Sequence, residues 1–507
     1  MAPRSSCSRG AEPVLSREAS PRGPAPRQSG ATTAHLRNSL RLVTTAWVFG
    51  AVWMYIITGA ALTQFAKQLG MSKIGFGILA ALPFAGCMFQ LPVSYIIERY
   101  GHRKKLFIWL GIVHRALWLV VAAIPWLLPE TARAYGMIVV VAFSWSVGQM
   151  IGPAWVSWMA DLVPERIRGR YFSRRSQAGQ IVGLATTLSI GVALDKAAAH
   201  GPDALLEAAA CGLAVAAVFG IVDFLFFLPV AEPVRRVPDR NISWRHLLLP
   251  PLADKNFRTF LVYTALLTFS LGYINQFIWL YLLDVARVSN TTANAMLVLV
   301  PLAIFMVMYP VWGRLIDRLG RKPVLIVCTL LLVLGASSWI FVTRERWLMG
   351  YAMGMIATTM WPGVDLGNFN ILLGLSTAQE DSQERGAHVA INSTVVALSG
   401  IASGVFGGVV AQTLENWHGS FLGQPLTFHG VLFLIASGVR LVAALWLFKL
   451  EDPGAHTTRS ALRFMGASLY SNVQQAMFVP GRLLWQIGRW TYTVATPLRR
   501  RAGKRGD

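Results

Sequence analysis

The most chemically active side chains of this sequence stand inside long apolar segments. Residues 361–370, WPGVDLGNFN, place Asp365 close to Asn368 and Asn370, just after a Pro-Gly pair that disturbs a helix. An ionisable side chain inside an apolar segment is costly, so it usually has a function or a partner. Asp365 is therefore the strongest single candidate: it could bind a cation, carry a proton or pair with a basic residue.

Three further charges lie in apolar segments. Arg115 and Asp223 fall at similar depths in two different segments, which favours a structural salt bridge between them. Arg440 occupies nearly the repeat position of Asp223, 217 residues further along the chain. Its partner could be Asp365 or backbone carbonyl groups, and the sequence leaves both open.

Two charged stretches between apolar segments resemble each other. SYIIERYGHRK occupies 94–104, and GRLIDRLGRK occupies 313–322. Their residues correspond at a constant separation of 219 positions, in the pairs Glu98–Asp317, Gly101–Gly320 and Arg103–Lys322. A second, looser repeat links 161–172 to 378–389. The sequence therefore predicts two similar halves in the same orientation, and such a repeat determines the architecture.

The composition is typical of a protein that crosses a membrane many times. Of the 507 residues, 54% are hydrophobic and 14% are charged, against about 25% charged residues in soluble domains. The net charge of +22 comes from Lys and Arg in the tails and in the breaks between apolar runs, a pattern that disfavours nucleic-acid binding. The four cysteines are scattered without metal or redox spacing, so no metal site is predicted.

Twelve apolar runs are long enough for transmembrane helices, which need roughly 20 residues each. They lie near 41–66, 73–97, 106–128, 134–160, 174–194, 205–230, 257–284, 292–316, 323–343, 347–375, 388–414 and 427–449. The predicted fold is an all-α membrane protein with two six-helix bundles. Its divisions are a disordered basic tail (1–39), the N-terminal bundle (40–230), a linker (231–256), the C-terminal bundle (257–450) and a basic tail with a candidate interfacial segment (451–507).

The distribution of Lys and Arg predicts the orientation in the membrane. Breaks on the side of the N-terminus hold roughly four or five basic residues each, whereas the opposite breaks hold about none to two. Both termini are therefore expected in the cytoplasm. The opposite loops are too short for a binding or catalytic domain, so function is expected inside the helical bundle or at its cytoplasmic face.

The charged stretch of the second half carries the pattern Gly-x-x-x-Asp-Arg-x-Gly-Arg-Arg/Lys in full, as Gly313, Asp317, Arg318, Gly320, Arg321 and Lys322. The first half keeps Arg99, Gly101 and Arg103 but has Glu98 at the acid position. With these loops, and over roughly residues 40 to 450, the chain resembles bacterial transporters of the major facilitator superfamily. The resemblance implies a place in the bacterial inner membrane and a cytoplasmic gate formed by these loops. A turn that only sets the topology is the alternative.

The resemblance also implies where a substrate binds. The first, fourth, seventh and tenth spans would line a central cavity that holds a small molecule near the midplane. Candidates for contact with this substrate, or with a coupled proton, are Trp53, Gln149, Asn275, Gln276, Asp365, Asn368 and Asn370. The implied molecule is a monomer that works in the lipid bilayer by alternating access.

Other classes of function find less support. The sequence has no Gly-x-x-x-x-Gly-Lys-Ser/Thr motif for ATP, and no cofactor is predicted. It has neither a His-Glu-x-x-His nor a Gly-x-Ser-x-Gly motif, so a membrane-embedded enzyme is disfavoured. A receptor or sensor with a transporter-like fold is the remaining alternative, although both tails are too short and too biased in composition for a packed interaction domain.

Overall fold

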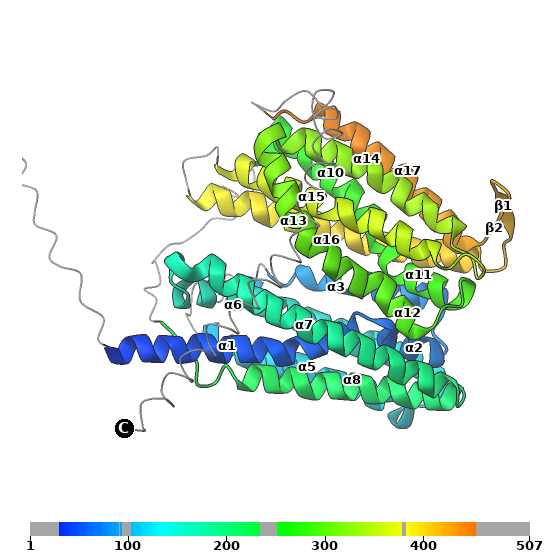
Figure 1. Ribbon diagram of the computed structural model, residues 1–507, viewed down its shortest axis with the longest axis horizontal. Coiled ribbons are helices and arrows are strands. Elements are labelled where there is room, and N and C mark those ends of the chain that lie inside the picture. The colour runs from blue at the N-terminus through cyan, green and yellow to red at the C-terminus, as the bar shows by residue number, and fades with distance from the viewer. Residues whose placement is uncertain (1–29, 91, 94–102, 234–250, 378–381, 453–507) are drawn as a thin grey trace, which may run out of the picture.

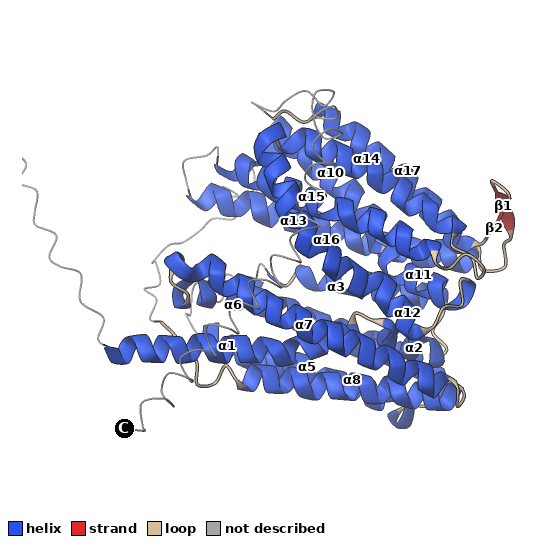
Figure 2. Ribbon diagram, in the orientation of Figure 1, coloured by secondary structure: helices blue, strands red, loops and turns tan. Residues whose placement is uncertain are grey.

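The computed structural model describes residues 30–90, 92–93, 103–233, 251–377 and 382–452. Almost all of this chain is helical, and its only described sheet is a two-stranded hairpin (Figure 2). The first half contains α1 (Gly30–Ile57), α2 (Ala60–Gln68), α3 (Lys73–Cys87), α5 (Arg103–Leu127), α6 (Glu130–Leu162), α7 (Glu165–Ala198) and α8 (Pro202–Leu225).

The second half begins with α10 (Lys255–Gly272), α11 (Ile274–Leu280), the π-helix η1 (Tyr281–Val285), α12 (Asn290–Asn294), the π-helix η2 (Ala295–Leu299) and α13 (Val300–Leu319). It continues with α14 (Arg321–Ser337), η3 (Ser338–Phe341), α15 (Met349–Thr377), α16 (Ser382–Thr413), β1 (Gly419–Phe421), β2 (Gln424–Leu426), α17 (Phe428–Trp446) and η4 (Leu447–Lys449). The seventh and eighth predicted spans are therefore each composed of several consecutive helical pieces.

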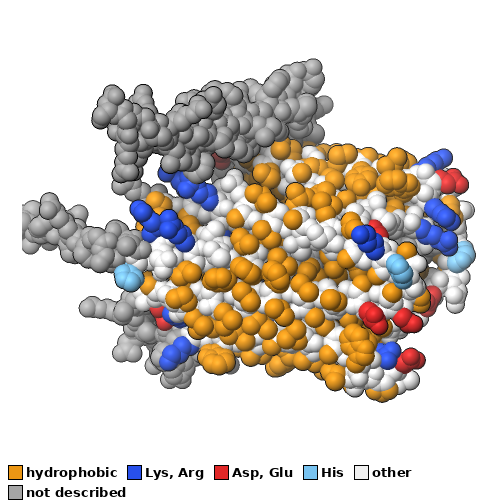
Figure 3. All heavy atoms as spheres, turned by 60° about the horizontal axis from the view of Figure 1, so that its bottom comes forward, with side chains coloured by type: hydrophobic (Ala, Val, Ile, Leu, Met, Phe, Trp, Pro, Cys, Tyr) orange, Lys and Arg blue, Asp and Glu red, His pale blue; other side chains and the backbone are white. Residues whose placement is uncertain are grey.

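Ten described segments are long and apolar enough to cross a membrane. The two other predicted spans correspond to α3 and α15. The described helix α3 has 15 residues, and α15 is long enough but is made less apolar by the polar residues around Asp365. The described helices are consistent with six spans in each half. The surface agrees with this arrangement, because a broad hydrophobic band separates charged side chains at the two ends (Figure 3).

The structure differs from the predicted divisions at the start of the chain. Helix α1 begins at Gly30, so residues 30–39 of the predicted tail are helical. Hydropathy could not detect this extension, because polar residues continue the helix beyond its apolar part. Residues 1–29, most of the linker and residues 453–507 lie outside the described part of the chain.

The two halves lie one above the other in Figure 1, with their helices running roughly horizontally. We call the end that holds the start of α1, Arg103 and Arg321 the basic end, and the end with the β-hairpin the far end. Helices α14 and α17 lie on the side of the second half that is remote from the first. Helices α3, α11 and α12 lie where the halves meet (Figure 1).

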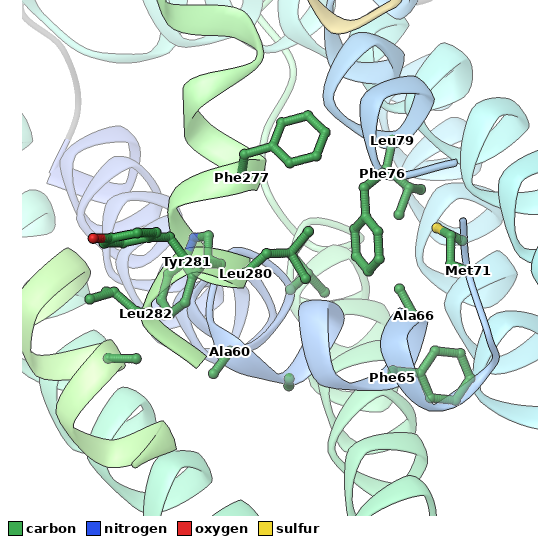
Figure 4. Packing of buried hydrophobic residues seen from close by; sticks show 14 of the residues in the cluster. Ala60, Phe65, Ala66, Met71, Phe76, Leu79, Phe277, Leu280, Tyr281 and Leu282 are labelled. Atoms are coloured by element: carbon green, nitrogen blue, oxygen red, sulfur yellow. The ribbon is translucent and has the colours of Figure 1, made fainter. Parts of the chain in front are cut away.

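The hydrophobic cores show where the halves are joined. One buried cluster contains residues of both halves, and all of them lie toward the far end. In Figure 4, Phe76 and Leu79 of α3 face Phe277 and Leu280 of α11 across this junction. The clusters nearer the basic end each belong to a single half, one within 257–450 and the other within 43–230. Among the described residues, buried apolar packing therefore joins the halves toward the far end, and the clusters nearer the basic end stay within single halves.

Glycines bring α3 and α16 together at this junction. A Cβ atom on Gly77 would stand 2.5 Å from the carbonyl oxygen of Gly404 and against the backbone of Gly408. Small residues allow such close packing between membrane helices. The backbones cannot make room for a methyl group without moving apart.

We therefore expect Gly77→Ala to weaken the junction by about 1–3 kcal/mol through overpacking. The midpoint temperature of unfolding in detergent should fall. Gly152→Ala on α6 is the matched control, because no atom lies within 4 Å of its added Cβ. Equal midpoints for the two variants would contradict the close packing of α3 on α16.

Candidate functional site

A single carboxylate at the far end accepts four hydrogen bonds from the opposite half. Asp195, near the end of α7, accepts hydrogen bonds from the backbone N–H groups of Asn290 and Thr291 at 2.6 and 3.0 Å. Their side chains donate to the same carboxylate at 3.0 and 2.6 Å. Because α12 begins at Asn290, the acid also lies at the positive end of a helix dipole. We call this set of contacts the Asp195 latch.

Further polar contacts join the halves beside the latch. The Gln64 side chain donates to the Asn290 side chain at 2.7 Å, and the Ala60 N–H donates to the Asn294 side-chain oxygen at 3.0 Å. Lys67 of the first half forms an ion pair with Asp284 of the second. Polar bonding and apolar packing thus close the same end of the molecule.

The charged contacts that the described residues make at the basic end remain inside each half. In the first half, the buried Arg103 pairs with Asp161 at 2.5 Å and with Glu232 at 3.7 Å. The Lys104 N–H donates to Glu232, and its ammonium group donates to the carbonyl of Leu228. This network fixes the start of α5 against the ends of α6 and α8.

The second half repeats this network. Arg321 pairs with Asp452 at 3.0 Å, and the Lys322 N–H donates to the same carboxylate. The Lys322 ammonium group donates to the carbonyl of Phe448, as Lys104 does to that of Leu228. The structural equivalents are therefore Arg103 with Arg321 and Lys104 with Lys322, not Arg103 with Lys322 as the separation of 219 residues predicts. In the sequence, one more residue separates Arg103 from Gly101 than separates Arg321 from Gly320, which a fixed separation cannot show.

The remaining residues of the predicted gate are only partly visible. Glu98, Arg99 and Gly101 lie outside the described residues. Gly320 has a φ of 95°, a conformation that favours glycine, and it ends α13 and allows α14 to begin at once. Asp317 and Arg318 are exposed, next to the half-buried Gly313, and Asp317 has no ion pair within the described part of the chain.

Asp365 lies on the side of α15 that faces away from α14. Its neighbours Gly363 and Gly367 face α14, where their Cβ positions would meet Cys328 and Leu325. Asp365 is exposed and accepts a 2.8 Å hydrogen bond from the hydroxyl of Tyr309 on α13. The carboxylate is therefore accessible and is held by a neutral donor.

The two amides near Asp365 differ in their surroundings. The Asn370 side chain donates to the carbonyl of Leu366, and the Asn370 carbonyl accepts from Arg321. Asn370 therefore stabilises its own helix and the start of α14. The side-chain oxygen of Asn368 is buried without a hydrogen-bond partner among the described residues. A polar solute that approaches α15 could satisfy it.

The other predicted substrate residues divide between the two halves. The side chains of Gln149 on α6 and Gln90 are hydrogen-bonded at 2.7 Å. Asn275 on α11 is exposed, and Gln276 donates to Thr63 of the opposite half at 3.3 Å. Gln276 thus belongs to the contacts that join the halves. Gln149 supplies a polar side chain in the first half, and Asn275 supplies one in the second half.

Trp53 lies elsewhere than predicted, because it is packed inside the first half. The Arg115 guanidinium carbon lies 3.3 Å from the centre of the Trp53 ring, and the ring also meets Trp118 edge-on. Arg115 and Asp223 approach to 3.9 Å between nitrogen and oxygen, and both side chains are about one-tenth exposed. The structure therefore brings this predicted ion pair together and makes Trp53 part of its lining.

Glycines make the space for these two charges. A Cβ on Gly50 would stand 2.5 Å from the Asp223 carboxylate, and one on Gly220 would stand 2.5 Å from Arg115. Two of the Arg115 guanidinium nitrogens are buried without a hydrogen-bond partner in the described structure. Arg115 is thus stabilised by an opposite charge and an aromatic face rather than by direct hydrogen bonds.

Arg440 bonds to a backbone carbonyl group, which is the second of the two kinds of partner that the sequence left open. It donates to the carbonyl of Leu332 at 3.0 Å and to the hydroxyl of Ser270 at 3.2 Å. The alternative partner, Asp365, is bonded to Tyr309 instead. Arg440 therefore ties α17 to α10 and α14 within the second half.

Asp195 is not among the site residues that the sequence predicts. This acid stands where an apolar run ends, and there it looks like an ordinary boundary residue. Its partners Asn290 and Thr291 are about a hundred residues away and carry no charge. The Ser-Asn-Thr-Thr stretch at 289–292 does resemble a helix start, which is the one local sign of an anion-binding end.

Comparison with known proteins identifies the family. The Major Facilitator Superfamily model matches residues 42–379, and no curated protein matches the sequence. The solved nucleoside transporter NupG is similar, with a TM-score of 0.60 and 15% identity over 82% of this chain and 98% of that chain. A bacterial homologue of the human lysosomal transporter Spinster gives 0.61 and 16%, over 82% and 96% of the two chains. The xylose transporter XylE from E. coli gives 0.55 and 14%, over 84% and 100%. The chain belongs to the Major Facilitator Superfamily and is a secondary transporter.

Proposed function

We propose that this transporter moves a small solute across the bacterial inner membrane, that its basic end faces the cytoplasm, and that protons drive it. The observation that carries most weight is the unequal closure of the two ends. Residues of both halves bond and pack at the far end, whereas the ion pairs of Arg103 and Arg321 stay within single halves. With the basic end in the cytoplasm, this is an inward-facing state.

The orientation is supported by the distribution of charge. Basic residues concentrate in the breaks at the basic end, and positively charged loops favour the cytoplasmic side. The similar Spinster homologue and XylE structures are also described as inward-facing and as partially occluded inward-open. We infer a small-molecule substrate from these similar transporters. We also propose that the monomer is the functional unit.

The loops of the predicted gate would act in the opposite state. Asp317 is exposed and has no ion pair within the described residues, as expected of a carboxylate whose partner is withdrawn. In the outward-facing state, we propose that Asp317 and Glu98 pair with basic residues when the basic ends approach. The structural networks around Arg103 and Arg321 would then hold each loop in position.

Asp365 is the proposed proton site. It lies on the tenth span, is accessible, and has a neutral phenol as its described partner. A carboxylate in this setting can gain and lose a proton without breaking an ion pair. A structure similar to this chain belongs to a D-xylose–proton symporter, which supports proton coupling for the present transporter.

The test of this function is solute accumulation in proteoliposomes. Radiolabelled nucleosides, pentoses and organic acids are offered with and without a pH gradient. We expect at least one solute to exchange, and its accumulation to require the gradient. In Asp365→Asn, exchange should persist and gradient-driven accumulation should fall to the level without a gradient.

Tyr309→Phe is the matched control, because it removes the hydrogen bond and keeps the carboxylate. It should retain most of the gradient-driven accumulation. If the Asp365→Asn variant accumulates solute as well as the wild type does, the assignment of Asp365 as the proton site is refuted. A protein that exchanges none of the solutes would contradict the small-solute function itself.

A further inference from the structure

A partly exposed guanidinium group lies between two tryptophans of the first half. The Arg175 guanidinium carbon on α7 is 4.4 Å from the centre of the Trp47 ring on α1. It is 5.0 Å from the centre of the Trp155 ring on α6. Indole rings attract a cation through their faces, so the two rings fix the position of this charge.

Arg175 has no anionic partner in the described part of the chain. Its Nε is buried without a hydrogen-bond acceptor, whereas its two terminal nitrogens are not among the buried, unpartnered atoms. The nearby acid Asp223 already stands beside Arg115. A cation that is partly withdrawn from water and makes no direct ion pair with a described residue is costly, which is typical of a binding residue rather than a structural one.

Neighbouring residues on α7 place Arg175 in the seam between α1, α6 and α7. One turn earlier, the Tyr171 hydroxyl donates to the carbonyl of Leu40 at 3.1 Å. One turn later, a Cβ on Gly179 would meet the Trp47 ring. Helix α7 lies on the side of the first half that faces the second (Figure 1). Arg175 therefore stands on a helix that borders the second half, the side from which the proposed solute enters.

We propose that Arg175 binds the negatively charged group of the transported solute, which is therefore an organic anion with a carboxylate or phosphate group. A guanidinium presents a planar fork of donors that matches either group in a bidentate way. The accessible terminal nitrogens are free to form these bonds, and Trp155 and Phe172, whose ring centres are 5.8 Å apart, offer an apolar surface beside them. This inference rests on the proposed entry of a solute from between the halves.

The test measures thermal stabilisation of the purified protein in detergent. The probes are benzoate, succinate, glycerol phosphate and a nucleoside monophosphate, beside their neutral counterparts benzamide, succinamide, glycerol and the nucleoside. We expect at least one anion, and none of the neutral counterparts, to stabilise the wild type. Arg175→Gln should bind that anion about 10- to 100-fold more weakly, because it loses a charged hydrogen-bonding partner.

Two variants separate binding from folding. Arg174→Gln removes the same charge from an exposed neighbouring position and should bind like the wild type. Arg175→Lys keeps the charge without the fork and should show an intermediate affinity. Arg175→Gln that binds the anion as tightly as Arg174→Gln would overturn the proposal, and so would stabilisation by neutral probes or by none of the anions.

Phosphatidylglycerol vesicles test whether a lipid headgroup is the occupant instead. If these vesicles, and none of the soluble anions, stabilise the protein in an Arg175-dependent way, the assignment to a transported solute is wrong. Binding in detergent requires neither transport nor a pH gradient. A protein that binds anions through Arg175 but fails to accumulate solute would therefore contradict the proposed proton coupling and leave this inference standing.

Discussion

Replacing Asp195 with asparagine is expected to open the far end of the transporter. The carboxylate accepts four hydrogen bonds from Asn290 and Thr291, and it faces the start of a helix. Asparagine keeps the size of the side chain but loses the negative charge and half of the acceptor capacity. Hydrogen bonds to a charged group contribute about 1.5–3 kcal/mol each. The loss of even one such bond should shift the balance between the two states about tenfold or more toward the proposed outward-facing state.

A single-cysteine variant reports this shift. Thr63 is buried at the junction of the halves, so Thr63→Cys should react with a membrane-impermeant maleimide from outside the cell only when the far end opens. The native cysteines are replaced by serine in this experiment. Labelling should be slow in the latched protein and about tenfold faster after Asp195→Asn. Asp203→Asn is the control, because Asp203 is an exposed acid on α8 that makes no hydrogen bond or ion pair with the described residues of the second half. Equal labelling in the two variants would show that the latch does not hold the far end closed.

Breaking the buried pair of Arg115 and Asp223 is expected to have the largest effect on stability. Removal of one member of a buried ion pair typically costs about 3–5 kcal/mol, because the other charge is left uncompensated. Arg115→Met keeps the bulk of the side chain over Trp53 and leaves Asp223 as an unpaired carboxylate. Asp223→Asn leaves Arg115 unpaired in the same way. Each single variant should lower the midpoint temperature of unfolding in detergent.

The double variant distinguishes a true pair from two independent defects. Arg115→Met with Asp223→Asn removes both charges, so it should be more stable than either single variant. The double-mutant cycle then gives the coupling between the residues. A double variant whose loss equals the sum of the single losses would show that the two charges do not compensate each other across their 3.9 Å separation.

The sequence predicted most of the fold because membrane helices are specified by local composition. Apolar runs of the required length identify the spans, and two similar charged loops identify the halves. The ends of the helices were less predictable, since α1 extends through polar residues 30–39. The breaks within the seventh and eighth spans, including η1 and η2, depend on tertiary packing and leave no clear pattern in hydropathy.

Residues of the candidate site were predictable only where the free-energy cost of placing a charge in an apolar segment points to them. Arg115, Asp223 and Asp365 stand out because a charge inside an apolar run requires an explanation. Trp53 shows the limit of this reasoning, because span number does not determine the side of a helix on which a side chain lies. Arg175 escaped notice because it follows Arg174 in a basic stretch and looks like part of a cytoplasmic loop, although α7 carries it to the two tryptophans.

We expect the two halves to close alternately at the far end and at the basic end. Spin labels at Thr131 and Ser420 report the far end, and labels at Ser173 and Arg314 report the basic end, in a cysteine-free background reconstituted in lipid nanodiscs. Distance distributions are compared between the protein with Asp195 and the Asp195→Asn variant. We expect the far-end distance to lengthen and the basic-end distance to shorten in the variant. If both spin-label distances are unchanged, or if both change in the same direction, alternate closure of the two ends is contradicted.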